Sequence, residues 1–149
     1  MVSTGPERDK ETMTRARLAA GFFVLAVLAA GGCRPDPSTP RGTAERFLDA
    51  HYVAIDLREA IAFTSGLAKQ KVEQEIALVS GVEIDENTRK PVVHYRLLEE
   101  HADGEHSVNF LYRGSIAVDG ADGFERRWMV TVRREDAGWR VTNYQELDG

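Results

Sequence analysis

The spacing of apolar residues changes from a helical to a strand period near Pro91. Before it, apolar side chains recur at intervals of three and four, which is typical of amphipathic helices. After it, they alternate with polar residues, which is typical of strands. Helices followed by strands with short turns predict an α+β fold, in which an antiparallel sheet covers its apolar face with the helices.

Three helices are predicted before Pro91. The first begins at Thr39-Pro40, because threonine can cap free backbone N–H groups and proline lacks a donor that the first turn does not need. The second begins at Asp56, which starts a capping-box-like sequence, and the third spans residues 67–79. The apolar stripe of the first helix consists of Ala44, Phe47, Leu48, His51 and Tyr52.

Four strands are predicted after Pro91, separated by turns at residues 102–104, 119–123 and 137–138. Gly114 interrupts the second strand and predicts a bulge or bend there. In the last strand, strict alternation puts Trp139, Val141, Asn143 and Gln145 on one face. The four strands form an antiparallel meander.

The N-terminal part has the layout of an export signal. Arg15 and Arg17 precede an apolar stretch, residues 18–30, which is shorter than the roughly 20 residues that span a bilayer. The only cysteine, Cys33, follows. Residues 28–33 resemble the lipobox of bacterial lipoproteins, although Ala30 stands where that family prefers leucine. The resemblance implies cleavage before Cys33 and attachment of lipid, palmitate included, to its thiol.

These features divide the chain into a signal peptide over residues 1–32, a lipidated cysteine and tether over residues 33–38, and a domain over residues 39–149. Met13 is an alternative start, because it directly precedes the basic residues. An ordinary secretory peptide or an uncleaved anchor remains open as an alternative. The expected location is the cell envelope, on the exported side of a membrane.

Composition excludes a disulfide within the chain and argues against one class of partner. One cysteine leaves no partner for a disulfide within the chain. The formal net charge of −5 argues against nucleic acid as a partner, because nucleic acid favours basic surfaces.

The predicted domain resembles the NTF2-like, or cystatin-like, α+β cone fold, with three helices on a curved four-stranded sheet. The resemblance is carried by the helical opening at residues 43–52 and by the final strand at residues 138–141. Within this superfamily the chain looks most like exported lipoproteins of the DUF4878 type. The resemblance implies a pocket between the helices and the concave sheet, and it implies little about the ligand.

Candidates for the pocket are few. They are Tyr52, His94, Arg96, Phe110, Tyr112 and Trp128. Only Tyr52 and His94 form a pair that could serve an enzyme, and neither matches the acid and donor positions of ketosteroid isomerases or dehydratases. We therefore predict no catalytic residues and no cofactor.

Two charged clusters have residue types that can form binding sites. His101 and His106 flank an acidic hairpin tip, where a solvated turn is more expected than a metal site. Four arginines, at positions 126, 127, 133 and 134, divide between the two faces of one strand, so a solvated, ion-paired strand is favoured over an anion site.

The sequence thus predicts a lipid-anchored envelope protein whose domain binds a small hydrophobic ligand or another envelope protein, without catalysis. One alternative is an isomerase or dehydratase that acts on a small hydrophobic substrate. The other is a structural or interaction subunit that forms homodimers through the sheet.

Overall fold

The computed structural model describes residues 34–82 and 89–148. The predicted signal peptide, the Met13 start and the lipid attachment at Cys33 lie outside these residues. Within the described ranges, no helix is long and apolar enough to cross a membrane.

The first helix, α1 (Pro40–Leu48), begins as predicted, with the Thr39 hydroxyl accepting a hydrogen bond from the Gly42 N–H at 2.9 Å. It continues into a wider π-helical turn, η1 (Asp49–Val53), in which the Ala54 N–H donates to the Asp49 carbonyl oxygen at 2.8 Å. The inserted turn redirects the chain at the end of α1.

The second helix, α2 (Leu57–Ala60), is short, and the Asp56 carboxylate caps it by accepting from the Glu59 N–H at 2.9 Å. A 3-10 turn, η2 (Ile61–Phe63), follows, and then α3 (Gly66–Val79). The three predicted helices are confirmed in place and order.

Residues before the predicted domain start at Thr39 already contact the domain. The Asp36 carbonyl oxygen accepts from the Thr39 N–H at 3.1 Å, and the Thr43 hydroxyl donates to the Pro37 carbonyl oxygen at 2.9 Å. A Cβ added at Gly42 would overlap the Asp36 carbonyl oxygen. The chain before α1 therefore folds back onto the first turn of that helix.

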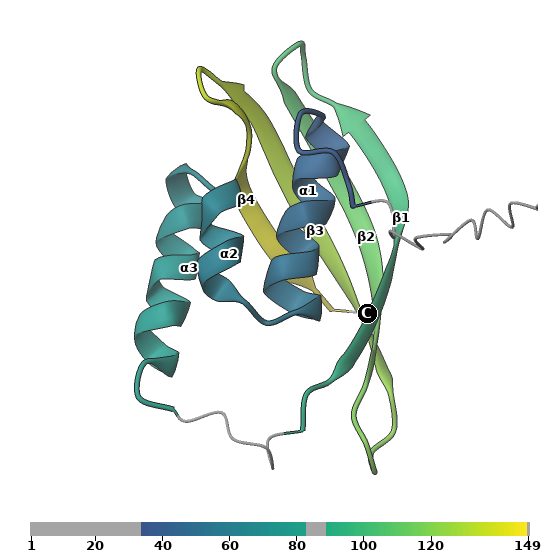
Figure 1. Ribbon diagram of the computed structural model, residues 1–149. Coiled ribbons are helices and arrows are strands. Elements are labelled where there is room, and N and C mark those ends of the chain that lie inside the picture. Colours follow the sequence, from purple (N-terminus) through teal and green to yellow (C-terminus); the bar gives the residue numbers. More distant parts are fainter. Residues whose placement is uncertain (1–33, 83–88, 149) are drawn as a thin grey trace, which may run out of the picture. The chain divides into compact units, whose positions relative to one another are not determined.

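The four strands are β1 (Val92–Ala102), β2 (Ser107–Ala117), β3 (Phe124–Glu135) and β4 (Gly138–Leu147). They form one antiparallel sheet in the order β1-β2-β3-β4. The helices lie on one face of this sheet (Figure 1). The predicted α+β class is confirmed.

The bulges are not where the sequence suggested. Gly114 pairs in register with Tyr95 on one side and Arg126 on the other, so of the bulge or bend predicted there the bulge is wrong. The pairing instead skips Leu98 in β1 and Thr142 in β4. Gly114 is required for another reason: the Trp128 indole occupies the space that a Cβ would fill.

The bulge at Thr142 changes which residues of β4 face the helices. Val141 and Tyr144 are both buried, at 0% and 6% exposure, although three positions separate them. An unbroken strand would have turned Asn143 inward with Val141. The alternation predicted from Trp139 and Val141 to Asn143 and Gln145 is therefore broken at Thr142, and Tyr144 takes the inner position.

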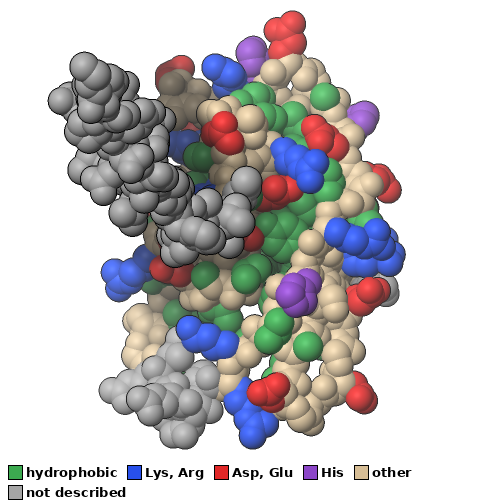
Figure 2. All heavy atoms as spheres, turned by 45° about the vertical axis from the view of Figure 1, so that its right-hand side comes forward, with side chains coloured by type: hydrophobic (Ala, Val, Ile, Leu, Met, Phe, Trp, Pro, Cys, Tyr) green, Lys and Arg blue, Asp and Glu red, His purple; other side chains and the backbone are tan. Residues whose placement is uncertain are grey.

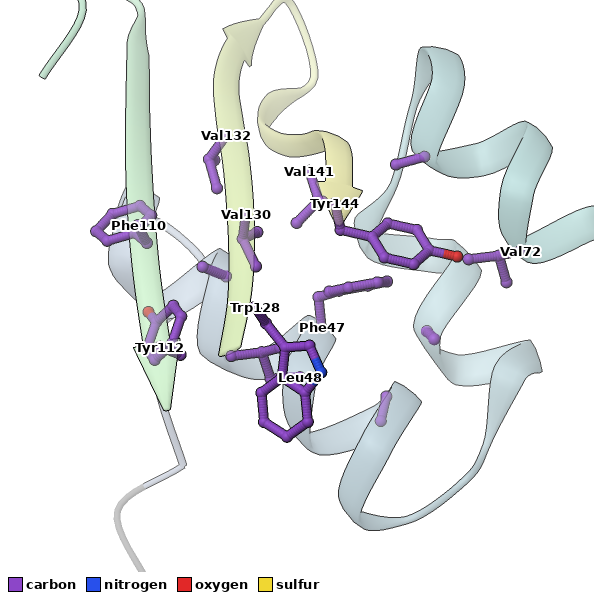
Figure 3. Close-up of a cluster of buried hydrophobic side chains, with 14 of the residues drawn as sticks. Phe47, Leu48, Val72, Phe110, Tyr112, Trp128, Val130, Val132, Val141 and Tyr144 are labelled. Carbon is purple, nitrogen blue, oxygen red and sulfur yellow. The ribbon is translucent and has the colours of Figure 1, made fainter. Parts of the chain in front are cut away.

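The core fills the space between α1, α3 and the sheet (Figure 3). Phe47 and Leu48 of α1 are fully buried, as is Val72 of α3. The sheet contributes Val108, Phe110, Tyr112, Trp128, Val130, Val132 and Val141. Phe47 also contacts Tyr144, with ring centroids 4.9 Å apart, which joins α1 to β4.

Candidate functional site

Four of the predicted pocket residues come together beneath α1 and η1. Phe110 and Tyr112 are fully buried and Trp128 is 1% exposed, so they are part of the core. The Tyr52 ring stacks on the Trp128 indole, with centroids 4.4 Å apart and an interplanar angle of 22°. Burial also raises the pKa of Tyr52, with the nearby Glu146 carboxylate adding to the effect. The innermost part of the cone is thus filled with aromatic side chains.

His94 does not join them. It lies in β1 between the buried Val93 and Tyr95, which packs against the core, so its side chain points to the opposite face of the sheet. Arg96 is exposed on that same outer face. The sequence-based placement of His94 with Phe110, Tyr112 and Trp128 is corrected, and the Tyr52–His94 pair is not formed.

An open groove lies where η1, the end of α3 and the starts of β1 and α2 meet. Its volume is about 360 Å³, and its lining consists of His51, Tyr52, Ile55, Leu57, Glu75, Leu78, Val79, Pro91, Val93 and Ile116. A second hollow of about 460 Å³ shares Ile55, Leu57 and Val79 with it. The two hollows are continuous, and we call them together the mouth groove; the first is largely apolar, whereas the second is also lined by Asp56, Arg58, Ser80 and Lys90.

Large apolar side chains are left in solvent at the mouth groove. Leu78 is 81% exposed, Val79 is 50% exposed and Ile55 is 39% exposed. Ile55 also has a φ of 55°, in the left-handed region that β-branched residues avoid. Strained residues of this kind cluster at ligand sites, where the surrounding structure holds them in place.

Three polar side chains form a connected group beside the groove. His51 Nε2 and Glu75 Oε2 lie 2.6 Å apart, and the Tyr144 hydroxyl donates to Glu75 Oε1 at 2.6 Å. Burial raises the pKa of Tyr144, and the hydrogen bond to Glu75 raises it further, so the phenol stays protonated. Both oxygens of the Glu75 carboxylate are therefore engaged, one by β4 and one by η1.

Sequence reasoning missed this group. The helical period places His51 in the apolar stripe of the first helix, and no local pattern distinguishes Glu75 from the other polar residues of α3. The one available signal was a histidine inside an otherwise apolar stripe, because a buried imidazole requires a polar partner.

The hairpin tip between β1 and β2 carries His101 and His106, which are both exposed. Among the described residues, no group of three or more His, Cys, Asp or Glu side chains is placed to hold a metal ion.

Charged side chains of both signs surround exposed apolar ones on the side of the molecule that carries β1 (Figure 2). That side therefore presents no extended region of one charge. Recognition of a ligand there depends on local arrangements of side chains.

Solved structures identify the architecture. An NTF2-like protein of unknown function from Pseudomonas putida superposes with a TM-score of 0.52 at 16% identity, covering 73% of this chain and 83% of that one. A ketosteroid isomerase-like protein from Erwinia carotovora atroseptica gives a TM-score of 0.52 at 13% identity, covering 76% and 97%. The chain has the NTF2-like fold.

A third solved structure of similar fold has a different description. A protein from Thiobacillus denitrificans, described as a calcium/calmodulin-dependent protein kinase type II association domain, gives a TM-score of 0.57 at 14% identity, covering 72% of this chain and 93% of that one. No protein-family model matches the chain, and no curated protein does either. At these identities the likeness establishes the fold alone.

Proposed function

We propose that this NTF2-like domain binds a small, largely apolar ligand in the mouth groove without catalysis, and that a lipid on Cys33 holds it at a membrane in the cell envelope. The observation that carries the proposal is the exposure of Ile55, Leu78 and Val79 around one groove. Ligand sites are typically concave and apolar with a few placed polar groups. Here those groups are His51 and Glu75.

Burial of this surface supplies the affinity. Apolar surface removed from water contributes about 25 cal/mol per Å², so covering side chains as exposed as Leu78 is favourable. The Glu75 carboxylate is 36% exposed at its side chain and can accept a further hydrogen bond from a ligand. The favoured ligand is thus an apolar molecule with one polar end that can donate a hydrogen bond.

A neutral apolar dye, N-phenyl-1-naphthylamine, tests the groove directly. We expect a saturable rise in its fluorescence with the wild-type protein and loss of that rise in Leu78→Asp. Leu67→Asp is the matched control, because Leu67 is 50% exposed on the same helix at the end away from the groove. Equal binding by wild type and Leu78→Asp would reject the groove as the ligand site.

The lipid part of the proposal is supported by the sequence around Cys33, where basic residues, an apolar stretch and two glycines precede the cysteine. Arg34, the next residue, forms an ion pair with Glu59 of α2, with Nη2 and Oε1 3.6 Å apart. The described domain thus begins directly after the proposed anchor.

Metabolic labelling with a fatty-acid analogue tests the anchor. The wild type should be labelled and recovered with membranes, whereas Cys33→Ser should be unlabelled and released. Equal labelling of both proteins would end the lipoprotein interpretation while leaving the groove proposal standing.

A second candidate is an NTF2-like isomerase or dehydratase. It is favoured by the pairing of His51 with Glu75, because an imidazole held by a carboxylate beside an apolar groove can move a proton. Ketosteroid and hydroxy-acyl substrates provide the assay. Turnover that is lost in His51→Gln and Glu75→Gln but kept in His94→Gln, whose side chain lies on the other face of the sheet, would replace the binding proposal with the enzyme.

A further inference from the structure

The outer face of the sheet carries three arginines in one row. Arg96 of β1 lies directly opposite Arg113 of β2, which lies directly opposite Arg127 of β3. Their neighbours in each strand, Tyr95, Tyr112 and Trp128, pack against the core, so the arginines point away from the helices. Side chains paired in this way have Cβ atoms about 4.5–5.5 Å apart.

Such a row is unfavourable by itself, because like charges placed directly opposite each other destabilise a sheet. Among the described residues, none of the three arginines forms an ion pair with a carboxylate. Arg127 donates one hydrogen bond to the Asp148 carbonyl oxygen at 2.8 Å, while its Nε is buried without a partner. The row therefore has positive charge and hydrogen-bond donors to spare.

Two of the arginines border the same hollow. It has a volume of about 170 Å³ and is lined by His94, Tyr95, Arg96, Arg113, Ser115 and Glu125. His94, Ser115 and Glu125 form the next cross-strand row beside the arginines. The hollow thus combines two guanidinium groups with an imidazole and a hydroxyl, and Glu125 is the one carboxylate at its edge.

We propose that this hollow binds a phosphate group, and we call it the outer phosphate site. Guanidinium groups match phosphate oxygens with paired, charge-assisted hydrogen bonds. A tetrahedral oxyanion can accept from Arg96 and Arg113 on different sides at once, and Ser115 adds a hydroxyl donor. The whole chain carries a net charge of −5, so its overall electrostatic field does not attract an anion. The attraction must come from the local positive charge of the arginine row.

The same row opposes a homodimer formed through this face. A symmetric interface uses the same patch of both copies, so it would bring six arginines together. The outer phosphate site shares no lining residue with the mouth groove and does not include Cys33. Two sources share the required chemistry, a lipid headgroup and a free phosphate ester.

Calorimetric titration of the full-length chain in a mild nonionic detergent tests the site and separates its sources. The probes are glycerol 3-phosphate and a short-chain phosphatidylglycerol, each compared with sodium chloride at equal ionic strength. We expect at least one probe to bind, and the dissociation constant to weaken about tenfold or more in Arg96→Gln and in Arg113→Gln, since each removes charge-assisted hydrogen bonds. Binding of the ester alone assigns a free phosphate, and binding of the lipid assigns a headgroup.

Two further variants make the test specific. Arg133→Gln is the matched control, because Arg133 is exposed on the same face of β3 six residues from Arg127, and it should bind as the wild type does. Glu125→Gln should bind more tightly, because it removes the repelling carboxylate. Absence of binding by the wild type, or equal weakening in Arg113→Gln and Arg133→Gln, would overturn the proposal. In thermal unfolding without phosphate, the midpoint of Arg113→Gln should be equal to or higher than that of the wild type. This result establishes that the variant folds.

Discussion

Gly114 occupies a position in the core where a single methyl group has no room. An added Cβ would lie 2.9 Å from Trp128 Cζ2 and closer still to Cη2 and Cζ3. The indole cannot retreat, because Trp128 is 1% exposed and stacks on Tyr52 with centroids 4.4 Å apart. A shift of the backbone would instead disturb the pairing of Gly114 with Tyr95 and Arg126.

Two effects of opposite sign therefore act on Gly114→Ala. Alanine inside a strand is favoured over glycine by roughly 0.5–1 kcal/mol through chain entropy. Overpacking a filled core typically costs about 1–3 kcal/mol, and overlap with a rigid ring belongs near the upper end of that range. The steric effect prevails, and we expect a net loss of about 2 kcal/mol, which lowers the thermal midpoint by on the order of 8 °C.

Circular dichroism during thermal and urea unfolding measures this loss, and a second background isolates its cause. Trp128→Leu replaces the indole and removes the ring atoms Cη2, Cζ3 and Cζ2, so adding Gly114→Ala to it should cost almost nothing. We expect the two sites to couple by more than about 1 kcal/mol in the double-mutant cycle. If Gly114→Ala costs the same with Trp128 and with leucine, contact with the indole is not what excludes a side chain at residue 114.

Three further results are expected. Phe110→Ala should lower the free energy of unfolding by about 3–5 kcal/mol in urea titrations, because Phe110 is fully buried, and an unchanged midpoint would remove it from the core. Tyr144→Phe should cost about 1–2 kcal/mol through the lost bond to Glu75, whose partial exposure reduces the effect, and the cost should vanish in a Glu75→Ala background, which removes the acceptor. Burial raises the pKa of all four tyrosines, Tyr52, Tyr95, Tyr112 and Tyr144. Above about pH 10 the unfolded chain alone loses these protons, so the free energy of unfolding should fall by up to about 1.4 kcal/mol per tyrosine per pH unit, and a constant value across that range in urea titrations would contradict their burial.

The regular parts of the fold could be predicted from the sequence because their signals are local. Thr39 and Asp56 cap helices through hydrogen bonds that span three residues, and the glycine at position 104 adopts the positive φ that its turn requires. Alternation likewise placed Phe110 and Tyr112 on the inner face of β2. In each case the determining contact lies within the element itself or its nearest neighbour.

The bulges could not be predicted in the same way. Gly114 suggested a bulge or bend, yet its missing side chain leaves room for the indole of Trp128 on the neighbouring strand. The real bulge in β4 falls at Thr142, which has no feature that distinguishes it from its neighbours in an alternating pattern. Contacts with other elements decide these positions, and a single sequence does not contain those contacts explicitly.

The residues of the candidate site are the ones that such breaks in periodicity bring together. The π-helical turn η1 presents the adjacent His51 and Tyr52 to the same groove, and the bulge at Thr142 turns Tyr144 inward to meet Glu75. A continuous α-helix separates adjacent side chains by about 100°, and an unbroken β4 would have offered Asn143 instead. The regular helix and strand periods therefore predict the core of this chain but not the connected group of His51, Glu75 and Tyr144. That group forms only because η1 and the bulge at Thr142 interrupt those periods.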